Sequence, residues 1–113
     1  MPAIILGTQK MLNTVSFKNI KLAAILDFDS FFHIPDYHAN ERAYQILDKI
    51  QSMLDYQNYA KFIIQTYNPE NIVLKNFIKN NFDNFFKEEL ANRKELNYPP
   101  FSDLINIIII GKN

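Results

Sequence analysis

Residues 21–42 read KLAAILDFDSFFHIPDYHANER, an apolar run that leads through a short acidic stretch and an aromatic loop into a long amphipathic segment. A short, unbroken apolar run such as Leu22–Leu26 predicts a buried strand, most often in a parallel sheet. In sheets of that kind, ligands lie outside the carboxyl ends of the strands. Asp27, Asp29 and the loop after them are therefore where we expect a functional site.

The segments that flank this stretch predict further elements of an α/β domain. Residues 40–56 carry apolar side chains at i, i+3, i+4 and i+7 spacing, which is typical of a helix with one buried face. Asn68-Pro69-Glu70 predicts a helix start, with Asn68 as the N-cap and Pro69 at the first position. We expect strands near residues 3–6, 21–27 and 61–66, the last two joined by a right-handed crossover, and helices near 40–57, 70–80 and 83–96.

The pair Pro99-Pro100 predicts the end of the last helix and a domain boundary, because proline disfavours continued helix. A polyproline peptide ligand is the weaker interpretation of these residues. Beyond the boundary, Leu104–Ile110 is a strongly β-prone strand without a partner in this sequence, which suggests a fragment or a chain cut short. Unpaired edges and an isoleucine-rich strand predict poor solubility for the chain alone.

Composition excludes several classes of protein. The 113 residues, 48% of them hydrophobic, are enough for one domain with a core. The 12 basic and 12 acidic residues balance, so no overall field draws the chain to nucleic acid or to an anionic membrane. Gly7 and Gly111 are the only glycines, which argues against a self-sufficient P-loop or Rossmann nucleotide site.

Other features of the sequence bear on its location. The chain has no cysteine, which suits a reducing compartment and excludes disulfides and thiolate zinc sites. No apolar run approaches the roughly 20 residues that span a bilayer. Residues 1–6 are too short for a signal peptide and lack its basic start. We therefore expect a cytoplasmic protein without a membrane partner.

The candidate metal ligands near the first loop are Asp27, Asp29, His33, Asp36 and His38. Carboxylates two residues apart after a strand can bind Mg²⁺, and histidine with aspartate can bind Zn²⁺. Their spacing matches no established ligand motif, so loop capping by solvated acids is the favoured interpretation. A metal-dependent hydrolase built on these residues is the weaker alternative.

An aromatic stripe of Phe82, Phe85 and Phe86 lies in the last predicted helix. Aromatic rings can form a stacking platform for the bases of single-stranded nucleic acid. At helical spacing, however, such a stripe belongs more often to a core. A buried stripe is therefore the favoured interpretation, and the stacking platform is the alternative.

Several short segments, taken together, resemble one family. They are Gly7-Thr8-Gln9, Phe17–Ile20, Leu26–Asp29, Ile34–Tyr37, Glu41-Arg42, Ile64–Glu70 and Arg93–Phe101. Their order and spacing resemble primosomal protein N′ (PriA), the family of bacterial replication-restart DNA helicases, over almost the whole chain. The resemblance implies a role in DNA replication and repair.

The resemblance also implies a fold and a set of site residues. The fold is α/β: residues 1–97 would be the C-terminal part of the second RecA-like (P-loop NTPase type) helicase lobe, and residues 98–113 a Pro-Pro joint with the first strand of a C-terminal domain. The resemblance implies DNA-binding or lobe-coupling roles for Gly7, Thr8, Gln9, Asp29, Asp36 and Arg42. The implied partners are single-stranded or forked DNA, primosome proteins or the rest of the helicase. No cofactor is expected in this chain, because the family binds ATP, Mg²⁺ and Zn²⁺ with parts that are absent here.

At two motifs the sequence departs from the family's pattern. Asn13 and Thr14 stand where the family has a Lys-Gly pair that couples DNA contact to ATP hydrolysis, and Ser16 stands for its aspartate. Met53 and Tyr56 stand at the positions of arginines that reach the γ-phosphate, and neither side chain can donate as a guanidinium does.

These departures predict a degenerate or truncated segment of a replication-restart helicase, without ATPase or helicase activity of its own. They also predict that the helix over residues 40–56 continues unbroken through the former catalytic loop. A DNA- or primosome-binding module without catalysis is the main alternative, and a decaying gene product without function is another.

Overall fold

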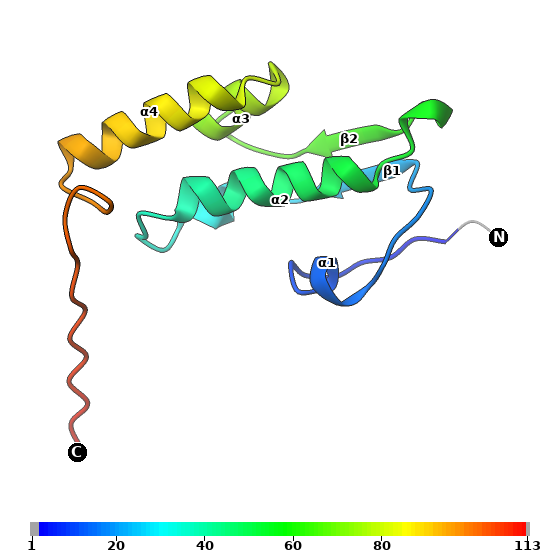
Figure 1. Cartoon of the computed structure of the whole chain (residues 1–113). Coiled ribbons are helices and arrows are strands. Elements are labelled where there is room, and N and C mark those ends of the chain that lie inside the picture. Colours follow the sequence, from blue (N-terminus) through cyan, green and yellow to red (C-terminus); the bar gives the residue numbers. More distant parts are fainter. Residues whose placement is uncertain (1–2, 113) are drawn as a thin grey trace.

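A computed structural model describes residues 3–112 and confirms the α/β class (Figure 1). The helices are α1 (Met11–Thr14), α2 (Ala39–Met53), α3 (Ile72–Ile78) and α4 (Phe82–Glu95), with 3-10 helices η1 (Phe28–Phe32) and η2 (Tyr56–Asn58). The strands are β1 (Leu22–Ile25) and β2 (Lys61–Ile64). In Figure 1, α2 lies in front of β1 and below β2, and the C-terminal segment runs away from the helices.

The two strands form a parallel pair whose hydrogen bonding continues past their ends. Leu22 lies opposite Lys61, and Ile25 lies opposite Ile64. The Gln65 N–H then donates to the Ile25 carbonyl at 2.9 Å, and the Phe28 N–H donates to the Gln65 carbonyl at 2.9 Å. These bonds align the carboxyl ends of β1 and β2, where the functional site is expected.

The core lies on one face of this strand pair. Its buried cluster is Phe28, Ala43, Tyr44, Leu47, Val73, Leu74 and Phe85, and Ile25, Phe62 and Ile64 of the sheet region pack against it. The strand residues alternate between half-buried and exposed, and Leu22 and Ile63 are 58% and 52% exposed. The prediction of a fully buried strand is therefore wrong: half of its side chains are exposed and the other half are only half-buried, because nothing in residues 3–112 covers the second face.

α2 confirms the predicted amphipathic helix but ends at Met53. At its end, Leu54 adopts an extended conformation and forms a parallel bridge with Ile20. The Asp55 N–H donates to the Ile20 carbonyl at 2.9 Å. This pairing directs the chain toward β2, so the prediction of an unbroken helix is confirmed as far as Met53 and is wrong for residues 54–56.

α3 begins at Ile72, after a different asparagine from the one predicted. Asn71 is the N-cap, and its Oδ1 accepts a hydrogen bond from the Val73 N–H at 2.8 Å. Asn68 lies in the turn before the helix, where its carbonyl accepts from the Asn71 N–H at 3.2 Å. Asn71 is placed to bond the free N–H groups of the first helical turn, so the prediction of Asn68 as the N-cap is wrong.

Two predicted strands do not form within the described residues. Residues 3–6 make no backbone hydrogen bond, and Ile4 is 100% exposed. Residues 104–110 are also without backbone hydrogen bonds, and Ile105 and Ile109 are 87% and 90% exposed. A strand needs a neighbour for its N–H and C=O groups, and neither segment lies beside one.

Candidate functional site at the carboxyl ends of the strands

Asp29 joins the carboxyl ends of β1 and β2. The Thr66 Oγ1 donates to Asp29 Oδ1 at 2.7 Å, and the Tyr67 N–H donates to Asp29 Oδ2 at 2.8 Å. These bonds, the one from Thr66 first, outweigh desolvation and lower the pKa of Asp29 below its ordinary value. The carboxylate therefore fixes the geometry of this edge by holding the loop after β2 against η1.

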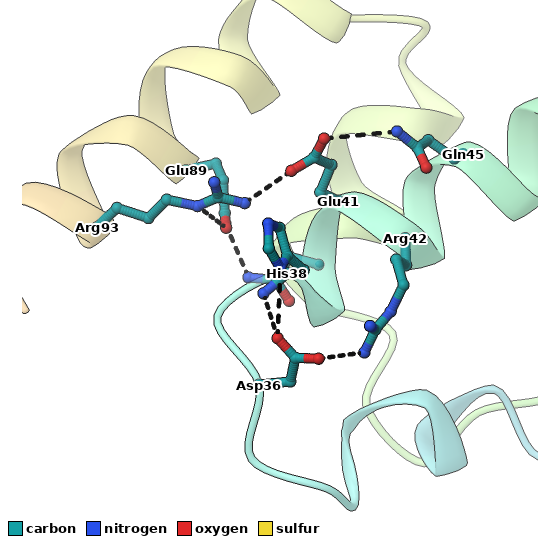
Figure 2. Close-up of polar contacts among 8 residues, drawn as sticks. Asp36, His38, Glu41, Arg42, Gln45, Glu89 and Arg93 are labelled. Carbon is teal, nitrogen blue, oxygen red and sulfur yellow. Dashed lines mark hydrogen bonds and ion pairs between the residues drawn. The ribbon is translucent and has the colours of Figure 1, made fainter. Parts of the chain in front are cut away.

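Asp36 and Arg42 lie at the start of α2 (Figure 2). Asp36 Oδ1 accepts a hydrogen bond from the His38 N–H at 2.9 Å, and Asp36 Oδ2 lies 2.6 Å from Arg42 Nη2. The His38 N–H and the pairing with Arg42 outweigh desolvation and lower the pKa of Asp36. Arg42 remains 54% exposed, so this pair orders the loop before α2 at the protein surface.

Arg93 forms the most buried ion-pair cluster of the described chain, and sequence reasoning did not single it out as a site residue. Its Nη2 lies 2.9 Å from Glu41 Oε2, and its Nε lies 3.0 Å from Glu89 Oε1. Asn40 Nδ2 donates to the second oxygen of Glu89 at 2.9 Å, and the guanidinium carbon lies 5.3 Å from the centre of the Tyr37 ring. Figure 2 shows the cluster bridging α4 and the first turn of α2.

The electrostatics of this cluster follow from its burial. The Arg93 side chain is 11% exposed, and that of Glu89 is 9% exposed. Burial by itself lowers the pKa of the Arg93 guanidinium, but the hydrogen bonds to Glu41 and Glu89 outweigh it, so the pKa is raised above its ordinary value. The i, i+4 spacing of Glu89 and Arg93 was a local signal for one of these pairs.

Gly7, Thr8 and Gln9 lie apart from the other predicted site residues. All three are exposed, and the carbonyls of Thr8 and Gln9 accept hydrogen bonds from Met11 and Leu12 at 2.9 and 3.1 Å as α1 begins. Figure 1 shows α1 below the C-terminal half of α2. Asp36 and Arg42 are instead at the N-terminal end of α2, so the structure divides the predicted site between two places.

The candidate metal ligands are not gathered into one site. Among residues 3–112, no group of three or more histidine, cysteine, aspartate or glutamate side chains is placed to hold a metal ion. Asp29 and Asp36 instead bond to the loops and helix that they position. The favoured interpretation of these two acids as loop-capping groups agrees with that geometry.

Comparison with known proteins identifies the family. Replication restart protein PriA of Thermotoga maritima is 34% identical over 110 residues, which is 97% of this chain. PriA of Borreliella burgdorferi is 38% identical over 111 residues, again 97% of the chain. The chain belongs to the PriA family. It spans only 15% and 17% of the length of these two relatives.

Other comparisons add no further likeness for this PriA-family chain. No family model matches it, and no solved structure matches it. Within the described residues, no helix is long and apolar enough to cross a membrane.

The two stretches where the resemblance implies departures from the family's pattern are linked by a hydrogen bond near the end of α2. Lys49 Nζ, one turn before the end of α2, donates to Asn13 Oδ1 at 2.5 Å. Met53 is the last residue of α2 and is half-buried, while Tyr56 in η2 is 51% exposed. A thioether and a phenol therefore stand where the family resemblance implies arginines.

Proposed function

We propose that this chain is a segment of the second, RecA-like helicase lobe of a PriA-type protein, kept as a scaffold without ATP hydrolysis or DNA unwinding of its own. The match to PriA over nearly the whole chain supports the assignment. The parallel β1–α2–β2 unit supports it too, because parallel strands joined through a helix are the building unit of such lobes. A role of this kind in DNA replication implies a cytoplasmic location.

The loss of catalysis rests on Met53 and Tyr56. A guanidinium presents a rigid fork of donors to phosphate, which neither methionine nor tyrosine can replace. Loss of an arginine that stabilises a transferring phosphoryl group costs about 10³–10⁵ in rate. We assign the binding of ATP, Mg²⁺ and Zn²⁺ to parts of the protein outside this sequence.

Under this proposal, Asp29, Asp36 and Arg42 have an architectural role. Asp29 holds the loop after β2, and the Asp36–Arg42 pair holds the start of α2. Residues 98–113 would be the joint to a C-terminal domain and its first strand. A turn at that joint is held by the Tyr98 N–H, which donates to the Arg93 carbonyl at 2.7 Å.

An ATP hydrolysis assay tests the loss of catalysis. The purified chain is incubated with Mg²⁺ and ATP, with and without a forked DNA, beside a heat-denatured sample of the same preparation. The proposal expects phosphate release equal to that of the denatured sample in both conditions. DNA-stimulated hydrolysis clearly above that control would refute it.

A DNA- or primosome-binding module is the second candidate function. The exposure of Gly7, Thr8 and Gln9 favours it, because exposed residues are accessible to a partner. Fluorescence anisotropy with a labelled fork at low salt tests DNA binding, since contacts to the phosphate backbone are strongest there. No change at tens of micromolar protein would exclude DNA as that partner.

A further inference from the structure

The aromatic side chains of α4 are divided between the core and the surface. Phe85 is 3% exposed, whereas Phe82 and Phe86 are 54% and 52% exposed. The prediction of a buried aromatic stripe is therefore right for Phe85 and wrong for the other two. A second exposed apolar surface lies on the sheet, and the arrangement of the strands indicates what it contacts.

One face of the β1–β2 pair is open to solvent. Ile25, Phe62 and Ile64 pack against the core, and side chains two residues apart along a strand share a face. The side chains that alternate with them therefore point to the opposite face, called here the open face. Its residues are Leu22, Ala24, Lys61 and Ile63, and all four are exposed.

The open face has the chemistry of a surface that is normally covered. Ala24 lies opposite Ile63 in the parallel register, so apolar groups of the two strands adjoin. Parallel sheets occur almost only with both faces covered, and unbroken apolar runs such as Leu22–Leu26 are typical of strands in them. Contiguous apolar surface of this kind marks a site of contact.

The length of the relatives indicates the source of the cover. The chain spans 15% and 17% of the two PriA proteins, so more than four-fifths of each lies outside the matching stretch. Parallel strands need crossover connections, which are usually helices that lie on the faces of the sheet. A helix from the remainder of the protein therefore fits the open face best.

The charge on the open face adds a feature of that helix. Lys61 is exposed and forms no ion pair within residues 3–112. Its position opposite Leu22 places the ammonium group at the border of the apolar surface. An acidic side chain on the covering helix would complement it, while the helix packs apolar groups against the two strands.

We propose that the open face binds an amphipathic helix from the part of a PriA-type protein that lies outside this sequence, with an acidic residue beside Lys61. The proposal rests on the proposed function, because it takes the chain as one segment of a lobe. The small side chain of Ala24 allows the helix to approach the sheet closely. A second copy of this chain is the competing occupant.

Single cysteines measure the cover, because the sequence contains no cysteine. Ala24→Cys places a thiol on the open face, and Tyr59→Cys places one at a residue that is 92% exposed in the turn before β2. Each variant is made in the isolated chain and in Thermotoga maritima PriA with its matching stretch replaced by this chain. Maleimide labelling is followed by mass spectrometry of the peptide that carries the introduced thiol.

The open face should be accessible in the isolated chain and covered in the chimera. Ala24→Cys is expected to react at least about tenfold more slowly in the chimera, because burial makes a thiol inert, whereas Tyr59→Cys should react at the same rate in both. Equal rates for Ala24→Cys in the two proteins, or equal slowing at both positions, overturn the proposal. An insoluble chimera also overturns it, because the parent protein would then supply no cover for this face.

Two further measurements test the identity of the occupant. Lys61→Glu in the chimera should make the Ala24→Cys thiol react faster, because it places like charges together, whereas Lys87→Glu on the exposed side of α4 should not. Equal effects of the two substitutions would overturn the acidic residue beside Lys61. Sedimentation of the isolated chain tests the second copy: a defined dimer that Ile63→Lys converts to monomer would overturn the helix as occupant.

Failure of this proposal can be told from failure of the proposed function. A chimera that hydrolyses ATP at the parent's rate but protects the Ala24→Cys thiol refutes the loss of catalysis and leaves the covered face. A chimera that hydrolyses ATP slowly but leaves that thiol reactive refutes the covering helix and leaves the loss of catalysis.

Discussion

Arg93 Nη2 lies 2.9 Å from Glu41 Oε2, although 52 residues separate them in sequence. Through this pair and Glu89, α4 is fixed to the first turn of α2, just beside the loop that carries Asp36. The cluster therefore ties the last helix to the edge where β1 and β2 end. We predict that this tie contributes to folding.

Arg93→Met is expected to destabilise the chain by about 2–4 kcal/mol, because it leaves the carboxylate of Glu89 buried without its cation. Arg42→Met is the matched control, since the Arg42 side chain is 54% exposed, and it should cost less than about 1 kcal/mol. Urea unfolding followed by circular dichroism measures both. Similar losses in the two variants would contradict the structural role given to Arg93.

Stability should fall in acid because of Asp29 and Asp36. The pKa of each carboxyl is lowered from an ordinary value of 3.8. Their contribution is thus fully present above about pH 4–5 and is lost as the pH falls through the native pKa. Asp29→Asn should flatten the acid limb of a plot of urea midpoint against pH, while Asp103→Asn in the exposed C-terminal segment should not. An unchanged acid limb in Asp29→Asn would be inconsistent with the hydrogen bonds from Thr66 and Tyr67.

Because the core covers only one face of the sheet, a buried and an exposed leucine can be compared. Leu47 is 0% exposed in α2, whereas Leu22 is 58% exposed on the open face of β1. Leu47→Ala is expected to lower the free energy of unfolding by about 2–5 kcal/mol. Leu22→Ala should change it by less than about 0.5 kcal/mol. Comparable losses, measured by chemical unfolding, would show that the second face of the sheet is covered in solution.

The C-terminal segment should control solubility. Ile107 and Ile109 are 79% and 90% exposed and have no neighbouring strand in the described chain. The double substitution Ile107→Lys with Ile109→Lys should lower the light scattering of concentrated samples, because charge opposes edge-to-edge pairing of strands. The urea midpoint should stay the same, since neither side chain packs on the core. Scattering that is unaffected by the substitutions would place the association elsewhere, for example on the open face of the sheet.

Local signals in the sequence predicted the elements that depend on local order. The apolar periodicity of residues 40–56 identified α2, and the apolar runs identified β1 and β2. The helix end at Met53 could not be predicted in this way, because it depends on Leu54 pairing with Ile20, a non-local contact. The contact between Arg93 and Glu41 is likewise non-local, so nothing beside either residue indicates it.

The open face of the sheet was missed for a different reason. The run Leu22–Leu26 does not alternate between apolar and polar residues, and such runs are typical of strands covered on both sides. Residues 3–112 supply the cover for one side only. For the candidate site, the sequence indicated Asp29, Asp36 and Arg42 by resemblance, but their hydrogen bonds and ion pair became visible only in the folded chain.

The central claim is that this segment keeps the architecture of a PriA lobe and has lost its phosphoryl-transfer chemistry. The most direct test replaces the matching stretch of the Thermotoga maritima protein with this chain and measures DNA-stimulated ATP hydrolysis, the activity that the family resemblance implies. We expect a soluble, folded chimera that hydrolyses ATP at least about 10³-fold more slowly than the parent. Changing both Met53 and Tyr56 to arginine should restore part of that rate. A chimera that hydrolyses ATP at the parent's rate would contradict it.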